Sequence, residues 1–183
     1  TSEESGLSFQ VQSGESIQIA VQGPIESSGM VALEIVLRPI NDGFQNRTLI
    51  SLDENQIYLG SNEFATTENG EPDHNTTDNP RASANHSVWW SFTAPEGTTK
   101  VAIEVLKREL ELDARLAIAV YLGTDFSEDF ELVTSNFSAS KDPFAFWVEP
   151  GQTYHLAIDG LKPYGQEPIY SAPHVYGQFE FRI

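Results

Sequence analysis

Alternation of apolar and polar residues is the feature of this sequence that most constrains its fold. In residues 87–93, Val88, Trp90 and Phe92 occupy every second position, with Trp89 and Ser91 between them. Successive side chains of a β-strand point to opposite faces, so a spacing of two predicts strands. The same pattern recurs at 101–105, 116–122, 154–158 and 179–183. We therefore expect half-buried antiparallel strands with one face towards a core.

Clusters of turn-forming residues separate these stretches. They contain Gly, Pro, Asn and Asp, and they lie at 41–43, 69–72, 94–97, 121–124 and 149–151. These residue types favour turns, either through a permissive or fixed backbone or through local hydrogen bonds. Many short strands separated in this way are typical of a sandwich of two sheets. The sequence predicts an all-β protein, an antiparallel β-sandwich of the jelly-roll type.

Residues 105–113 do not follow the alternation. They contain helix-forming residues, and Leu106 and Leu110 are four positions apart, as on one face of a helix. One or two helical turns, an extension of the preceding strand and a long loop are all compatible with this stretch.

The first 37 residues resemble the end of the chain. Residues 9–23 align without a gap on 146–160, and residues 33–37 align on 179–183 with the same apolar phase. Such self-similarity indicates a repeat. We predict an N-terminal half-repeat, similar to a β-hairpin, at 1–40, and a jelly-roll domain at 41–183.

A half-repeat needs something to pack against, because a lone hairpin is marginally stable in water. The partner can be a preceding domain, an edge of the domain at 41–183, or a neighbouring subunit joined by strand addition. In strand addition, alternate apolar side chains enter the core of the acceptor. The candidates are Phe9, Val11, Ile17, Ile19 and Val21.

Six segments of the chain, taken in order, resemble a known family. They are NDGF at 41–44, GSNEFAT at 60–66, ENGEPDH at 68–74, SVWWSFTAP at 87–95, LAIAVYLGT at 116–124 and GQTYHLAIDG at 151–160. The set is similar to the bacterial extracellular β-sandwich repeats related to pre-peptidase C-terminal domains, over about 41–183. The resemblance implies a non-catalytic jelly roll of a secreted or cell-surface protein. Such repeats often occur in tandem, and some bind calcium. The stretches 106–112 and 161–176 depart from it.

The loop at 68–79 is the candidate metal site. The chain carries 27 Asp and Glu against 10 Lys and Arg, a net charge of −17. Calcium takes oxygen ligands from carboxylates, amides and carbonyls, which this loop offers. A solvated acidic loop without a metal is the alternative interpretation. The candidate ligands are Asp42, Glu68, Glu71, Asp73 and Asn75.

The aromatic residues raise carbohydrate binding as an alternative function, as in an accessory module of a secreted hydrolase. Trp89 and Trp90 are the candidates for stacking on a sugar face. Alternation places the two indoles on opposite faces of one strand. We therefore also consider that one packs in the core while the other covers a sheet face or an interface.

Composition and motifs argue against several other classes. The strong negative charge disfavours nucleic acid, and no apolar stretch is long enough to insert in a membrane. The chain has no Cys, so it forms no disulfide and offers no thiolate. It contains no nucleophile elbow, zinc-protease motif or Gly-rich phosphate loop. We expect a non-enzymatic, extracellular or cell-surface module that is structural or adhesive. Its expected partners are copies of itself, neighbouring repeats or a glycan.

Overall fold

The computed structural model describes residues 7, 9, 11, 14–23, 29–30, 32–74, 86–110, 115–138, 143–161 and 176–183. The chain divides into two compact units, Thr1–Ile35 and Val36–Ile183. This division falls a few residues before the boundary between 40 and 41 that the sequence suggests.

The larger unit is built of strands. Its described elements are η1 (Phe44–Asn46), β1 (Thr48–Leu49), β2 (Tyr58–Ser61), β3 (Val88–Thr93), β4 (Lys100–Leu110), β5 (Arg115–Leu122), β6 (Glu131–Ser138), β7 (Phe144–Trp147), β8 (Thr153–Leu161) and β9 (Gly177–Arg182). The one helix among the described residues is the short 3-10 turn η1, and none is long and apolar enough to cross a membrane.

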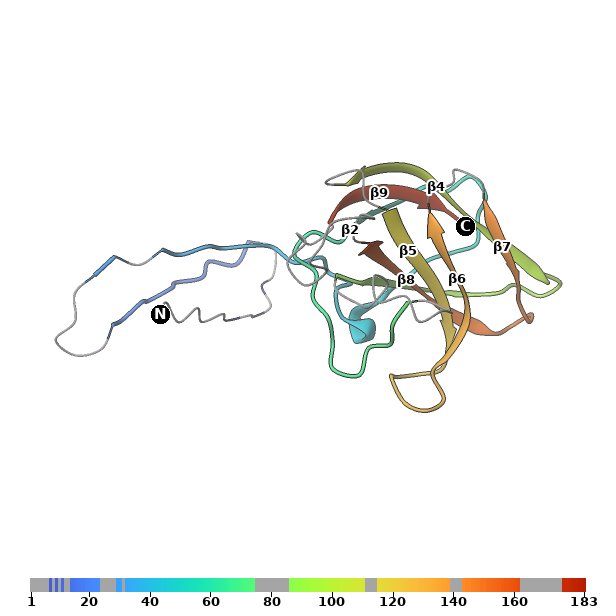
Figure 1. Ribbon diagram of the computed structural model, residues 1–183, viewed down its shortest axis with the longest axis horizontal. Helices are drawn as coiled ribbons and strands as arrows, with labels where there is room; N and C mark the ends of the chain where they lie inside the picture. Colours follow the sequence, from blue (N-terminus) through green and yellow to red (C-terminus); the bar gives the residue numbers. More distant parts are fainter. Residues whose placement is uncertain are drawn as a thin grey trace, which may run out of the picture. The chain divides into compact units, whose positions relative to one another are not determined.

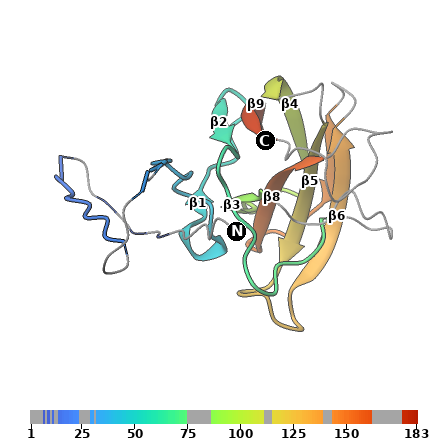
Figure 2. The ribbon, with the colours of Figure 1, turned by 60° about the vertical axis from the view of Figure 1, so that its left-hand side comes forward.

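The strands form two sheets packed face to face (Figures 1 and 2). One sheet has the order β1-β3-β8-β5-β6 and the other the order β2-β9-β4-β7. Every neighbouring pair is antiparallel except β1 and β3, which are parallel. Without β1, two four-stranded sheets remain, and their order is that of an eight-stranded jelly roll. The predicted all-β sandwich of the jelly-roll type is confirmed.

The main core lies between the two sheets. Trp90 of β3 packs edge-on against Phe181 of β9, with ring centroids 5.1 Å apart. Burial of each such side chain contributes about 1.5–3 kcal/mol relative to exposure. The alternate apolar residues that we expected to face inward belong to this core: Val88, Trp90, Phe92, Val101, Ile103, Leu116, Ile118, Val120, Tyr154, Leu156, Ile158, Phe179 and Phe181.

The outer face of the first sheet is also covered, which the sequence did not predict. Trp89, Tyr121 and Ala157 point away from the main core, yet they are buried in a second cluster. Phe44 of η1 belongs to this cluster, and Phe126 packs against it. The expectation of half-buried strands is therefore wrong for β3, β5 and β8, because connecting loops cover their outer face.

The stretch with helix-like spacing continues strand β4. Its pairing with β9 shifts register between Val105 and Lys107, which is a β-bulge at Leu106. The bulge inserts one residue and interrupts the alternation of two. Leu106 and Leu110 look helical in the sequence although both lie in a strand, because residues four apart share one side of a strand as well as of a helix. Of the two stretches in which the chain departs from the resembled family, 106–112 and 161–176, residues 111–112 and 162–175 lie outside the described residues.

The smaller unit contains no helix or strand among its described residues. Gly14 lies in a turn with a φ of +83°, and 15–23 continue without a regular element. The large apolar side chains that the structure describes in this unit are exposed to solvent. Among the five predicted assembly residues, the exposed fraction runs from 44% for Ile17 to 57% for Val21. The five are Phe9, Val11, Ile17, Ile19 and Val21.

Candidate functional site

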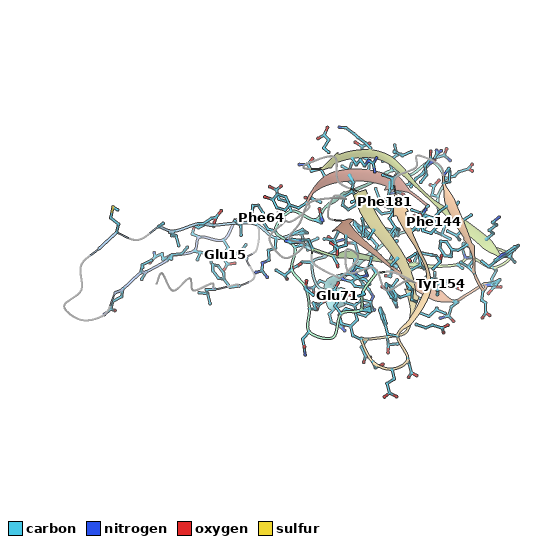
Figure 3. All side chains as sticks on the ribbon, in the orientation of Figure 1. Glu15, Phe64, Glu71, Phe144, Tyr154 and Phe181 are labelled. Atoms are coloured by element: carbon cyan, nitrogen blue, oxygen red, sulfur yellow. The ribbon has the colours of Figure 1, made fainter. Side chains whose placement is uncertain are left out.

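Three connecting segments meet over the outer face of the first sheet, and together they form what we call the loop cluster: residues 41–47, 65–74 and 123–130. Aromatic rings hold the segments to the sheet. Phe44 contacts Trp89 edge-on with centroids 5.2 Å apart, and it contacts Phe130 in the same way at 5.2 Å. Figure 3 labels Glu71 within the loop cluster, whereas the labelled Tyr154 and Phe181 belong to the sheets. Most of the predicted metal ligands lie in these loops.

Asp42 joins the first of these segments to the second. Its Oδ1 accepts a hydrogen bond from the backbone N–H of Thr66 at 2.5 Å, and its Oδ2 accepts one from the Thr66 hydroxyl at 2.9 Å. Arg38 lies beside the same carboxylate, with Nη1 3.8 Å from Oδ2. Both carboxylate oxygens of Asp42 therefore serve the protein's own loop.

Glu68 and Glu71 act in a similar way. The Oε2 atom of Glu68 accepts a hydrogen bond from the backbone N–H of Phe44 at 2.5 Å. The Oε2 atom of Glu71 accepts one from the backbone N–H of Glu68 at 2.8 Å. Hydrogen bonds to charged groups are stronger than neutral ones, so these carboxylates fasten loop backbone that has no strand to pair with.

The closeness of these carboxylates affects their charge. Burial raises the pKa of Glu68 above its ordinary value of 4.5, and the negative charges of Glu71 and Asp42 raise it further. The hydrogen bond from Phe44 acts against this rise and lowers the pKa. Asp42 and Glu71, two of the four acidic side chains that we predicted as metal ligands, are thus close enough to a third, Glu68, to repel its charge.

A buried polar network around His74 lies next to these carboxylates. His74 and Ser87 are both fully buried. The Nδ1 atom of His74 is 2.9 Å from the Tyr121 hydroxyl, and its Nε2 atom is 2.7 Å from the Ser87 hydroxyl. The Tyr121 hydroxyl donates to the backbone oxygen of Asp73 at 3.2 Å, and burial strongly raises the Tyr121 pKa. No pattern in the sequence indicated this network, because its members come from separate segments of the chain, 13 and 47 residues from His74.

The network contains a Ser, a His and a Glu, but it does not have the geometry of a hydrolytic triad. In a triad the acid contacts one ring nitrogen and the Ser the other. Here Oε1 of Glu71 lies 3.4 Å from Nε2 of His74, the same nitrogen that contacts Ser87. All three side chains are shielded from solvent, so a substrate does not reach Ser87 in this conformation. The arrangement holds the loop cluster on the sheet.

The fit of this site to calcium is partial. Oε1 of Glu71 is buried without a hydrogen-bond partner, although Nε2 of His74 lies 3.4 Å from it. Asp73 is exposed, and Asn75 lies outside the described residues. Within the part of the chain that the structure describes, no group of three or more His, Asp or Glu side chains is arranged to hold a metal ion.

A second buried histidine lies on the same sheet face. The Nε2–H of His155 donates to the backbone oxygen of Gly123 at 2.7 Å, while its Nδ1 atom is buried without a hydrogen-bond partner. Burial lowers the pKa of His155; the charge of Arg47 lowers it further, and the hydrogen bond to Gly123 acts in the opposite direction. Its ring also contacts Phe44 at 5.0 Å, so this histidine helps to hold the loop cluster in place.

The two predicted glycan-stacking residues are both buried. Trp89 is 0% exposed beneath the loop cluster, and Trp90 is 3% exposed between the sheets. Stacking needs an open ring face, so we correct that expectation: neither indole is available to a sugar. The exposed indole is that of Trp147 on the short strand β7, with Nζ of Lys100 5.6 Å from its ring.

The second candidate region is the row of exposed apolar side chains in the smaller unit. We call Phe9, Val11, Ile17, Ile19 and Val21 the apolar row. Exposed apolar groups at alternate positions of an extended segment are the feature that strand addition requires. Each of these five is more than two-fifths exposed. The structure thus leaves all five predicted assembly residues accessible to a partner.

The fold and the two candidate regions define a jelly-roll β-sandwich with an extra N-terminal segment. No protein-family model, curated protein or solved structure matches the chain. The relationship to pre-peptidase C-terminal domains therefore remains a hypothesis that rests on the six segments of the sequence.

Proposed function

We propose that this protein is a non-enzymatic extracellular module, structural or adhesive, that joins to neighbouring β-sandwich units through residues 1–37. The observation that carries the proposal is the exposure of the apolar row. The five apolar side chains are about half exposed, so covering them would recover about half of the ~1.5–3 kcal/mol that separates exposure from full burial of each. A partner that covers them is the simplest way to recover that free energy.

Strand addition is the mode of contact that suits this segment. Backbone N–H and C=O groups of the extended chain would pair with a sheet of the neighbour, and alternate side chains would enter its core. The contact joins the N-terminal segment of one unit to a sheet of the next, which are two different surfaces. Each unit can therefore both donate its segment and accept another, so the contact repeats from unit to unit. Unless the rotation closes into a ring, such contacts build a head-to-tail filament or array.

The first prediction concerns self-association of the purified chain. In pure solution the available partners are other copies, so we expect species larger than a monomer that grow with concentration. Ile17→Asp combined with Ile19→Asp should abolish them, because both carboxylates would have to be buried at the contact. Analytical ultracentrifugation over a hundredfold concentration range measures this.

Gln18→Asp is the matched control for that experiment. It adds a negative charge in the same segment but on the opposite side of the strand, so the variant should associate like the unaltered chain. A monomer at every concentration would contradict the proposal, as would association that the double variant retains.

A bound calcium ion near Asp42, Glu68 and Glu71 is the second part of the proposal. It is supported by the repulsion that Glu71 and Asp42 exert on Glu68 and by the Oε1 atom of Glu71, which is buried without a hydrogen-bond partner. A divalent cation would relieve the repulsion and supply the partner that this oxygen lacks. The carboxylates would serve as ligands in addition to their hydrogen bonds to the backbone.

Calcium binding predicts a rise in the unfolding midpoint. A ligand that binds only the folded state stabilises it by about 2.7 kcal/mol at 100 times its dissociation constant. Scanning calorimetry in calcium and in EGTA measures the shift, with magnesium for comparison. Glu71→Gln should remove the shift and the exposed Glu54→Gln should leave it. An equal midpoint in calcium and EGTA would contradict this part and leave the apolar row unaffected.

A further inference from the structure

The N-terminal segment corresponds to the last three strands of the sandwich position by position. The apolar row aligns with residues that are at most 6% exposed in the complete unit. Leu33 and Ile35, 58% and 70% exposed, align with residues of β9 that are equally well buried. The five residues of the apolar row match, in order, Phe146, Val148, Tyr154, Leu156 and Ile158. Leu33 and Ile35 match Phe179 and Phe181.

The backbone supports this correspondence independently of the side chains. Gly14 aligns with Gly151, which lies in the turn before β8. Gly14 has a φ of +83° and Gly151 has a φ of +77°. This left-handed region is costly for other residues, so a glycine is needed at both turns. The two segments therefore share the turn as well as the apolar phase.

The corresponding strands do not lie in one layer of the sandwich. Strand β8 is central in one sheet, between β3 and β5, whereas β7 and β9 belong to the other sheet (Figure 1). Residues 16–23 align with 153–160 of β8, and residues 33–36 align with 179–182 of β9. If the correspondence holds in the assembled protein, these two stretches enter opposite sheets and do not pair with each other.

We propose that the N-terminal segment supplies the counterparts of β7, β8 and β9 to a second jelly-roll unit that has β2 to β6 but lacks its own last three strands. This rests on the proposed function and names the partner. A complete copy of the chain does not suit this role, because its own β8 already fills the place between β3 and β5. A complete copy can accept the segment only along an outer edge.

The register identifies which residues would become neighbours. In the complete unit, Ala157 of β8 is the register partner of Ala119 in β5. Ala20 aligns with Ala157, so it should lie opposite Ala119 of the acceptor. In the other sheet, Glu180 of β9 is paired with Lys107 of β4, so Glu34 should lie opposite Lys107.

The test uses the full chain together with a fragment of residues 41–142 as the probe, because the fragment carries β1 to β6 and leaves the places of β7 to β9 empty. The two are refolded together from urea. We expect a complex of one chain with one fragment, at the expense of any self-associated chain. Ile19→Asp should weaken it at least about tenfold, since the carboxylate would enter the acceptor's core. Gln22→Asp should not, because the complete unit has Asp159 at the matching position.

Cysteine pairs test the register itself, and the chain has no Cys of its own. Ala20→Cys in the chain should form a disulfide with Ala119→Cys in the fragment, and Glu34→Cys should form one with Lys107→Cys. Register partners lie within the Cα distances that disulfides span. Ala20→Cys with Lys107→Cys, from opposite sheets, is the control that should not react. Self-association without fragment binding, or equal cross-linking of all pairs, would overturn the inference and leave the proposed function standing.

Discussion

At the scale of single residues, the acidic side chains have a structural role that their number alone does not reveal. Asp42, Glu68 and Glu71 each accept a hydrogen bond from loop backbone. A carboxylate suits this role because it accepts several hydrogen bonds and donates none. Burial of the carboxylate raises the pKa of Glu68, and the like charges that this arrangement brings close raise it further.

Removing the charge of Glu68 should therefore stabilise the protein at neutral pH. Because its pKa is raised on folding, the folded state holds the proton more tightly than the unfolded state. The carboxylate then costs stability as pH rises above its ordinary value of 4.5. Glu68→Gln keeps an oxygen for the Phe44 N–H and removes the repulsion. Urea unfolding in EGTA should show a higher midpoint for the variant at pH 7.

The advantage of Glu68→Gln should shrink as the pH falls towards 4, where the carboxyl of the unaltered protein takes up a proton. Glu54→Gln is the control, since Glu54 is exposed and no contact of its side chain is described in the loop cluster. A variant that is less stable at pH 7 would show that the hydrogen bond to Phe44 matters more than the repulsion.

The hydroxyl of Tyr121 should also contribute to stability. It is buried and contacts both His74 and the backbone oxygen of Asp73. Tyr121→Phe leaves those two groups without this partner, which should cost about 1–3 kcal/mol of unfolding free energy. Tyr58→Phe is the matched control, because its hydroxyl bonds to Ser51 are exposed and should cost less. Equal losses in the two variants would contradict a special role for the network.

At the scale of elements, alternation in the sequence predicted the inward faces of the strands, because it is a local property of extended chain. Val88, Trp90 and Phe92 face the main core and Trp89 faces away from it, as expected. The burial of Trp89 could not be read in the same way. It depends on Phe44 and Phe126, which approach from loops at positions remote in the sequence.

The helix-like stretch of β4 also shows that contacts with distant residues decide the conformation of an element. The spacing of Leu106 and Leu110 suits a strand as well as a helix, and the bulge at Leu106 breaks the alternation that would have marked a strand. Pairing with β7 on one part of the strand and with β9 on the other holds it extended. The strand's partners, supplied by distant residues, decide its conformation.

At the scale of the whole molecule, the two units differ in how far their described apolar side chains are buried. In Val36–Ile183, apolar rows from two sheets bury each other. In Thr1–Ile35, rows of the same phase stay exposed. A chain that carries both a complete sandwich and exposed counterparts of its last strands is suited to joining one unit to the next, which is the basis of the function proposed for it.

Alternation, turn residues and the internal repeat were enough to predict an all-β jelly roll and the apolar row, because each is written in neighbouring residues. The candidate metal loop was also visible, as a run of acidic residues. Three features could not be predicted from the sequence. They are the use of the loop carboxylates to hold loop backbone, the burial of Trp89 and Trp90, and the network of His74, Ser87 and Tyr121. These depend on contacts between separate segments, from 13 residues apart for His74 and Ser87 to 47 for His74 and Tyr121, and only packing in three dimensions brings those segments together.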